Sequence, residues 1–153
     1  MKQLIKKSMA MSSLLFVLFI ALLSFSSPKG GEGFEIFLDS KLVLQQFGKE
    51  LTTVKSIRLE KSISNSQISV RYFHCGQTGK NRSITIRNAN NKILKEWRFA
   101  DASASSLASK DPSMIFKVAD VLSLQKNNPG QFGLYYSSDQ LPKGRQLATL
   151  LVD

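Results

Sequence analysis

Apolar and polar residues alternate with a period of two along most of this 153-residue chain, in short runs that turn-forming residues separate. Clear examples are FEIFL at 34–38, QISVRYFHC at 67–75 and RSITIR at 82–87. A period of two places every second side chain on one face of a β-strand, whereas a helix needs a period of 3.6. Because no window of a dozen residues carries a sustained helical stripe, the pattern predicts an all-β fold.

The spacing of the runs predicts an antiparallel β-sandwich of about eight or nine short strands, with a barrel as the alternative. A tight turn is expected at Asp39–Ser40 and another at Pro142–Gly144, and the segment 110–124 has room for one helical turn. The runs expected to be extended are 34–38, 41–47, 54–60, 67–75, 82–87, 92–99, 114–118, 121–124, 132–138 and 146–152.

The same alternation predicts which side chains face the core. One residue in two along each run is apolar, and these positions share one face of their strand. The expected inward residues are Ile36, Leu38, Ile57, Leu59, Ile68, Val70, Tyr72, Ile84, Ile86, Trp97, Phe99, Phe116, Leu134 and Tyr136.

The N-terminus has the pattern of a secretory signal peptide. Three lysines within the first seven residues precede an apolar run at 14–23, and small polar residues follow. That run is shorter than the roughly twenty apolar residues that a transmembrane helix needs. We therefore expect a signal peptide over 1–26, and a secreted or periplasmic protein without a transmembrane span after cleavage. A flexible lead-in over 27–33 and a single β-sandwich domain over 34–153 would follow.

Charge and cysteine content narrow the classes of function. Three of the 21 basic residues lie in the expected signal peptide and no acidic ones do, which leaves 18 against 11, a net charge of +7. Such an excess favours anionic partners. An exported protein meets little nucleic acid, so we expect no nucleic-acid partner. A single cysteine excludes an internal disulfide framework, so packing alone must stabilise the fold.

The stretch HCGQTGKNR at 74–82 holds the only histidine and the only cysteine of the chain. Its GQTGK part does not match a P-loop, which needs a glycine at the position of His74 and a Ser or Thr at that of Asn81. Its glycines and polar residues are typical of a turn instead. We expect a structural hairpin in which His74 points into the core and Cys75 points away from it.

These two residues give little support to enzyme or metal chemistry. Adjacent residues of a strand point to opposite faces, so His74 and Cys75 do not easily bind one ion, and Cys75 lacks a nearby base. The carboxylates share no spacing that would pair them. We therefore expect no enzymatic activity and no cofactor. The alternative is a metal-binding or redox protein that uses His74, Cys75 and Met114.

Basic residues are concentrated between positions 71 and 98, where seven of them accompany the single acidic residue Glu96. If their outward positions coincide, they form one positive face across neighbouring strands. We expect an exported, non-enzymatic binding or accessory domain of the cell envelope. Its partner would be an unknown anionic ligand, such as a polysaccharide, a lipid headgroup or an envelope protein. The residues expected to bind it are Lys80, Arg82, Arg87, Lys143 and Arg145.

Two longer stretches, HCGQTGKNRSITIRNANNKILKEWRF and LYYSSDQLPKGRQLAT, carry a resemblance. Their HCG, GK-R, K-W-F and YYSS-LP-GR elements resemble those of small exported bacterial proteins of an uncharacterised family. The resemblance covers most of the chain after the expected signal peptide and implies a compact β-sandwich. It supplies no catalytic residue.

Overall fold

The computed structural model describes residues 31–102 and 113–153, and these form nine β-strands, one α-helix and two short 3-10 helices. The expected signal peptide, residues 27–30 of the lead-in and most of the loop at 100–113 lie outside the described residues. The elements are β1 (Gly33–Leu38), β2 (Lys41–Phe47), η1 (Gly48–Thr52), β3 (Lys55–Leu59), η2 (Lys61–Ile63), β4 (Gln67–Phe73), β5 (Arg82–Arg87), β6 (Ile93–Phe99), β7 (Met114–Lys117), α2 (Val118–Leu124), β8 (Phe132–Ser138) and β9 (Leu141–Val152).

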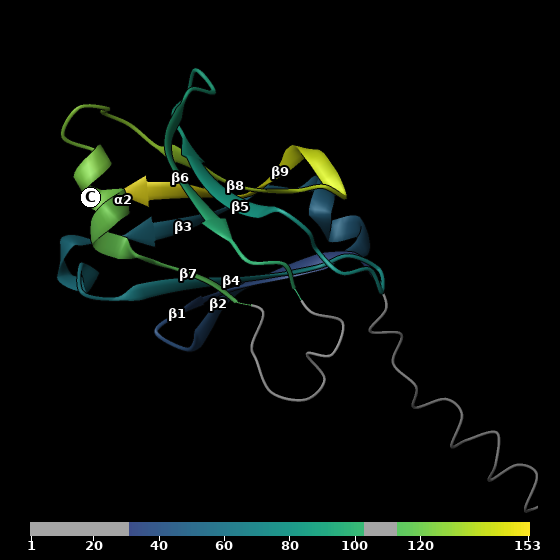
Figure 1. Cartoon of the computed structure of the whole chain (residues 1–153). Coiled ribbons are helices and arrows are strands. Elements are labelled where there is room, and N and C mark those ends of the chain that lie inside the picture. Colours follow the sequence, from purple (N-terminus) through teal and green to yellow (C-terminus); the bar gives the residue numbers. More distant parts are fainter. Residues whose placement is uncertain (1–30, 103–112) are drawn as a thin grey trace, which may run out of the picture.

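The strands form two sheets that pack face to face. One sheet has the order β2-β1-β4-β7 and the other has the order β3-β9-β8-β5-β6. Figure 1 shows them as a lower and an upper layer, with α2 at one end of the sandwich. Neighbouring strands pair antiparallel, except that β3 and β9 run parallel. The predicted all-β sandwich is therefore confirmed, with one parallel pair added.

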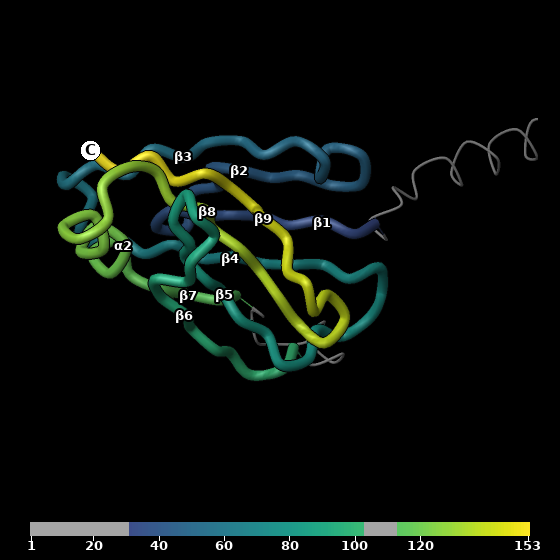
Figure 2. The backbone as a smooth tube through the Cα atoms, turned by 90° about the horizontal axis from the view of Figure 1, so that it is seen from above, coloured from purple at the N-terminus to yellow at the C-terminus, as the bar shows by residue number. Residues whose placement is uncertain are grey.

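Five connections cross between the sheets: β2 to β3, β3 to β4, β4 to β5, β6 to β7 and, through α2, β7 to β8. Within the sheets, the strand orders β1-β4-β7 and β9-β8-β5-β6 match those of the A-B-E and G-F-C-C′ strands in immunoglobulin-type sandwiches. The view from above in Figure 2 shows the five-stranded sheet crossing over the other layer. This likeness concerns the fold and says nothing of function.

The core lies between the two sheets. All of the expected inward residues are either buried in it or packed against it, which confirms the alternation as a guide to burial. Phe34, Met114 and Phe132 are further core residues that the prediction omitted. Trp97 of β6 stacks on Phe116 of β7 with ring centroids 4.5 Å apart, which joins the two sheets at one edge.

The strand expected at 121–124 is wrong, because these residues belong to helix α2. Val118 and Val121 are both buried, and a spacing of three residues puts them on one face of a helix rather than one face of a strand. The preference of valine for strands is overridden by this contact with the core. The helical turn allowed for in this segment is thus the correct part of the prediction.

The turn expected at Pro142–Gly144 is also wrong. The turn between β8 and β9 lies at residues 139–140, and β9 runs without a break from Leu141, five residues earlier than expected. Pro142 is tolerated because it is near the first residue of the strand, and Gly144 adopts a φ of +72° where the pairing with β8 shifts register. By contrast the Asp39–Ser40 turn is confirmed, with positive φ at both residues.

The start of β1 shortens the expected lead-in, because Gly33 is already part of the strand and Glu32 is held by the hydroxyl of Tyr72.

Helix α2 spans seven residues. Within residues 31–102 and 113–153, no helix is long and apolar enough to cross a membrane.

Candidate functional site

The stretch HCGQTGKNR connects the two sheets. Its first four residues close a tight turn on themselves, in which the backbone N–H of Gln77 donates to the carbonyl of His74. Cys75 and Gly76 have positive φ there. The flanking strands β4 and β5 lie in different sheets, so the expected hairpin between them is wrong. The chain leaves β4 at Phe73, turns, and enters the other layer.

The expected positions of His74 and Cys75 are confirmed. His74 is buried between the sheets, whereas Cys75 is exposed. The ring nitrogen Nε2 of His74 lies 2.8 Å from the hydroxyl of Tyr136 and 3.3 Å from that of Ser138. Gly79, two residues after this turn, packs closely against Tyr136, because a Cβ at Gly79 would lie 3.0 Å from the Tyr136 hydroxyl. The stretch therefore closes one end of the core.

A cluster of rings and charges surrounds His74. Tyr72 stacks on Tyr136 with ring centroids 4.2 Å apart, and the Tyr72 hydroxyl donates to Glu32 at 2.6 Å. Arg145 forms an ion pair with Glu32 at 3.3 Å. Burial raises the pKa of the Tyr72 phenol, and its bond to Glu32 raises it further. Burial also raises the pKa of the Tyr136 phenol. Both phenols therefore stay protonated, and the cluster joins the two sheets.

Burial is also the main cause that lowers the pKa of His74. Glu32 opposes this shift, and the positive charges of Arg145 and Arg82 reinforce it. The ring is therefore held in its neutral form at neutral pH.

The structure does not bring the residues of the alternative metal site together. Met114 is fully buried in the core on β7, whereas Cys75 is exposed. The Nε2 atom of His74 already has two hydroxyl partners. No group of three or more His, Cys, Asp or Glu residues suited to a metal ion occurs in the part of the chain that the structure describes.

The expected anion-binding residues separate into four environments. Arg82 is buried, and its Nε and Nη2 atoms donate to the carbonyl of Ala100 at 2.8 and 2.6 Å. Arg145 points to Glu32 in the cluster around His74. Lys80 and Lys143 are exposed. Only Arg87 lies on the outer face of the five-stranded sheet with its guanidinium fixed in place.

Arg87 is held by neutral groups. Its Cζ lies 4.2 Å from the ring centroid of Tyr135, its Nε donates to Thr85 at 3.3 Å, and its Nη1 donates to Asn91 at 3.1 Å. A stacked guanidinium loses little conformational freedom when it binds an anion. Gly144 of β9 lies beside Nη2, since a Cβ there would be in ordinary contact with it at 3.6 Å.

The other arginines differ from Arg87 in the groups that they contact. The chain has six arginines, and four of them form ion pairs with carboxylates. Arg82 is buried against a backbone carbonyl. Among the described residues no carboxylate lies within ion-pair distance of Arg87, so an external anion can neutralise its charge. The four ion pairs are Arg58–Asp153, Arg71–Glu35, Arg98–Glu96 and Arg145–Glu32.

Hydroxyl and amide groups share this outer face with Arg87. Ser83 and Ser137 lie side by side on β5 and β8 with their hydroxyls 2.8 Å apart. The Tyr135 hydroxyl donates to Gln146 at 3.0 Å, and Gln146 donates to Thr149 at 3.3 Å. The sequence prediction did not group these residues. The signal was present as alternation, since Ser83, Thr85 and Arg87 share the parity opposite to Ile84 and Ile86.

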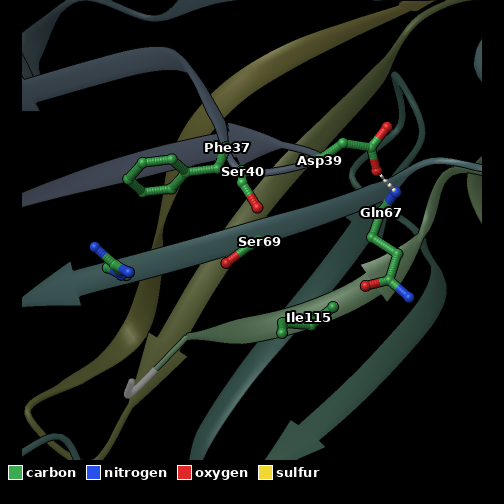
Figure 3. Close-up of a pocket in the computed structure, with 7 residues that line it drawn as sticks. Phe37, Asp39, Ser40, Gln67, Ser69 and Ile115 are labelled. Atoms are coloured by element: carbon green, nitrogen blue, oxygen red, sulfur yellow. Dashed lines mark hydrogen bonds between the residues drawn. The ribbon is translucent and has the colours of Figure 1, made fainter. Parts of the chain in front are cut away.

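The outer face of the four-stranded sheet has a hollow of about 210 Å³, shown in Figure 3. Phe37 and Ile115 line it on either side of Ser69, and the Asp39 carboxylate accepts the backbone N–H of Gln67 at 2.8 Å. Its cation, Arg71, already lies 3.7 Å from Glu35. This hollow is therefore less suited to an anion than the face around Arg87.

Comparison with protein-family models and with curated proteins finds no match to this chain.

Proposed function

We propose that this protein is a non-enzymatic binding domain of the cell envelope that holds an acidic polysaccharide on the outer face of its five-stranded sheet. The observation that carries the proposal is Arg87, a fixed guanidinium on an open sheet face whose partners are all neutral. Guanidinium groups bind carboxylate and sulfate-like groups through paired N–H donors. An anion on Arg87 would neutralise a guanidinium for which the described residues offer no carboxylate.

The groups around Arg87 favour a polysaccharide over the other anionic partners. Ser83, Thr85 and Ser137 present hydroxyls on the same face, and Gln146 adds an amide. Such groups both donate and accept hydrogen bonds, which suits the hydroxyls of sugars. A lipid surface would call for apolar side chains at this place. The N-terminal pattern supports export to the compartment where such polymers occur.

A binding assay with two charge-matched variants tests the proposal. Arg87→Gln removes the candidate contact, and Lys117→Gln removes one positive charge from the exposed edge strand of the other sheet. We expect Arg87→Gln to weaken binding of polygalacturonate by about tenfold, the scale of one charge-assisted hydrogen bond. Lys117→Gln should leave it nearly unchanged. Binding should also weaken as salt rises, because exposed charges are screened beyond about 10 Å at 0.1 M.

Isothermal titration calorimetry at low and high salt measures both effects. If the two variants bind polygalacturonate equally well, the positive charge acts only through the net charge of the protein, and the proposed site is wrong. Failure of the unmodified protein to bind any acidic polysaccharide would refute the function itself.

A further inference from the structure

A polar hollow of about 330 Å³ lies on the same outer face as Arg87, toward the beginning of β5. Its residues come from the four neighbouring strands β6, β5, β8 and β9 and the loops beside them. Ser83 of β5 pairs with Arg98 of β6 on one side and with Ser137 of β8 on the other. These three residues form one row across the sheet, and all of them line the hollow.

The base of this hollow is a pair of hydroxyls. The Ser83 and Ser137 oxygens lie 2.8 Å apart, and Ser83 is buried although it faces outward. When one hydroxyl donates to the other, the second keeps a proton, and both keep lone pairs. The pair therefore offers a ligand one donor and several acceptors at a fixed place.

The walls of the hollow combine opposite charges with apolar rings. Arg98 Nε lies 3.3 Å from Glu96, and its terminal nitrogens remain available on a side chain that is 84% exposed. Phe99 and Pro142 add apolar surface. On the remaining side the Asn81 amide donates to Asp139 at 2.9 Å, which holds the turn between β8 and β9 beside the start of β5.

This combination selects the chemistry of the ligand. A simple anion would meet the carboxylates of Glu96 and Asp139, and an alkyl chain would leave the hydroxyl pair and the charges without partners. A sugar ring carries vicinal hydroxyls that both donate and accept, and its C–H surface packs on apolar rings. A sugar can therefore use the hydroxyl pair, the charged groups and the apolar rings together.

The hollow and Arg87 lie at a distance that one oligosaccharide can span. Ser83 and Arg87 lie four positions apart on β5, which corresponds to about 13 Å at roughly 3.3 Å per residue. Both side chains share the outward parity of the strand. We propose that this hollow is a sugar subsite, in which Ser83, Ser137, Arg98 and Glu96 bind one sugar ring of the polymer whose acidic group contacts Arg87. The identity of the polymer rests on the proposed function, whereas sugar binding in the hollow is argued from its own lining residues.

The test uses three small probes and nuclear magnetic resonance of the isotope-labelled protein. Trigalacturonate carries sugar rings and carboxylates, maltotriose carries rings alone, and triglutamate carries carboxylates alone. We expect trigalacturonate to shift the signals of Ser83, Ser137 and Arg87. Maltotriose should shift the two serines alone, and triglutamate should shift Arg87 alone.

A double variant, Ser83→Ala with Ser137→Ala, removes both hydroxyls at once and leaves neither without its partner. It should weaken trigalacturonate binding by about tenfold, since two neutral hydrogen bonds are lost, and leave triglutamate binding unchanged. Glu96→Gln, on the exposed wall, should weaken maltotriose and trigalacturonate binding without any change of fold.

The pattern of shifts separates the two proposals. If Arg87 responds to trigalacturonate while Ser83 and Ser137 do not, the subsite is wrong and the anion-binding function stands. If the serines respond to both sugars and Arg87 to none of the probes, the subsite stands and the acidic polymer is wrong. If no signal moves with any probe, both are wrong.

Discussion

Gly133 lies directly beneath the ring of Tyr135 on the outer face of the five-stranded sheet. A Cβ on Gly133 would lie 2.5 Å from Cε2 of that ring, so only glycine lets the ring lie against the strand. The guanidinium of Arg87, on the neighbouring strand, then lies 4.2 Å from the ring centroid. The position of Arg87 thus depends on the small size of a residue two places before the tyrosine.

We expect Gly133→Ala to destabilise the protein and displace the ring of Tyr135. Extra volume in a tightly packed place costs about 1–3 kcal/mol. The displaced ring would also release Arg87, so binding of polygalacturonate should weaken together with stability. Urea unfolding measures the first effect and calorimetric titration the second.

The double variant Gly133→Ala with Tyr135→Ala serves as the control. Because the clash requires the ring, alanine at 133 should cost much less stability when Tyr135 is already alanine. Equal costs in both backgrounds would show that the contact between Gly133 and Tyr135 does not constrain the face.

Arg82 and Lys80 are predicted to differ in role although they are two residues apart. Arg82→Gln should cost about 1–3 kcal/mol, because the buried Arg82 side chain donates twice to the carbonyl of Ala100 and both bonds are lost. Lys80→Gln should change stability by less than about 0.5 kcal/mol, since Lys80 is exposed. Thermal unfolding of the two variants side by side decides the matter. An Arg82→Gln protein as stable as the unmodified one would contradict a structural role for Arg82.

Alternation predicted the layers of this fold well, because burial between two sheets imposes a period of two on each strand. It identified the inward parity of Ile84 and Ile86 and, by extension, the outward parity of Arg87. It failed at 121–124, where a three-residue spacing of valines contacts the core from a helix. It also failed at Pro142, where a register shift lets the strand begin before the expected turn.

The candidate site was less accessible to prediction, because charge counts ignore partners. Arg82 and Arg87 look alike in sequence, yet Arg82 is buried and donates to a backbone carbonyl, whereas Arg87 stacks on Tyr135 on the outer face of the sheet. Arg145 has the inward parity of its pairing partner Tyr136 and meets Glu32, which lies more than a hundred positions earlier. Such pairings depend on which strands become neighbours, and local patterns do not contain that information.

The hydroxyl of Tyr136 is predicted to stabilise the fold, whereas that of Tyr135 is not. Tyr136→Phe leaves the buried Nε2 of His74 with Ser138 alone, at 3.3 Å, so we expect a loss of about 1–2 kcal/mol. Tyr135→Phe removes a bond to Gln146 on the outer face, where water replaces it. Its cost should stay below about 0.5 kcal/mol. Urea unfolding of the matched pair tests this, and equal losses would mean that the buried bond adds nothing.

The surroundings of His74 predict how stability depends on pH. The ring faces Tyr72 on its own strand, Tyr136 and Ser138 on β8, and the charges of Glu32, Arg82 and Arg145. Burial lowers the pKa of His74 below its ordinary value of 6.5. The positive charges of Arg145 and Arg82 lower it further, and Glu32 opposes the shift. The unfolded chain therefore takes up a proton at a higher pH than the folded protein does. Stability from this group is complete above pH 6.5 and is lost as pH falls toward the lowered pKa.

His74 is the only histidine of the chain, so one variant isolates its contribution. We expect the free energy of unfolding of the unmodified protein, measured in urea, to decline between pH 7 and pH 5. In His74→Gln the decline over this interval should be much smaller, because carboxylates titrate mainly below it. The comparison uses the slope with pH rather than absolute stability, so any cost of the substitution itself cancels. A wild-type protein equally stable at both pH values, or a variant with the same slope, would show that His74 is not held neutral by the fold.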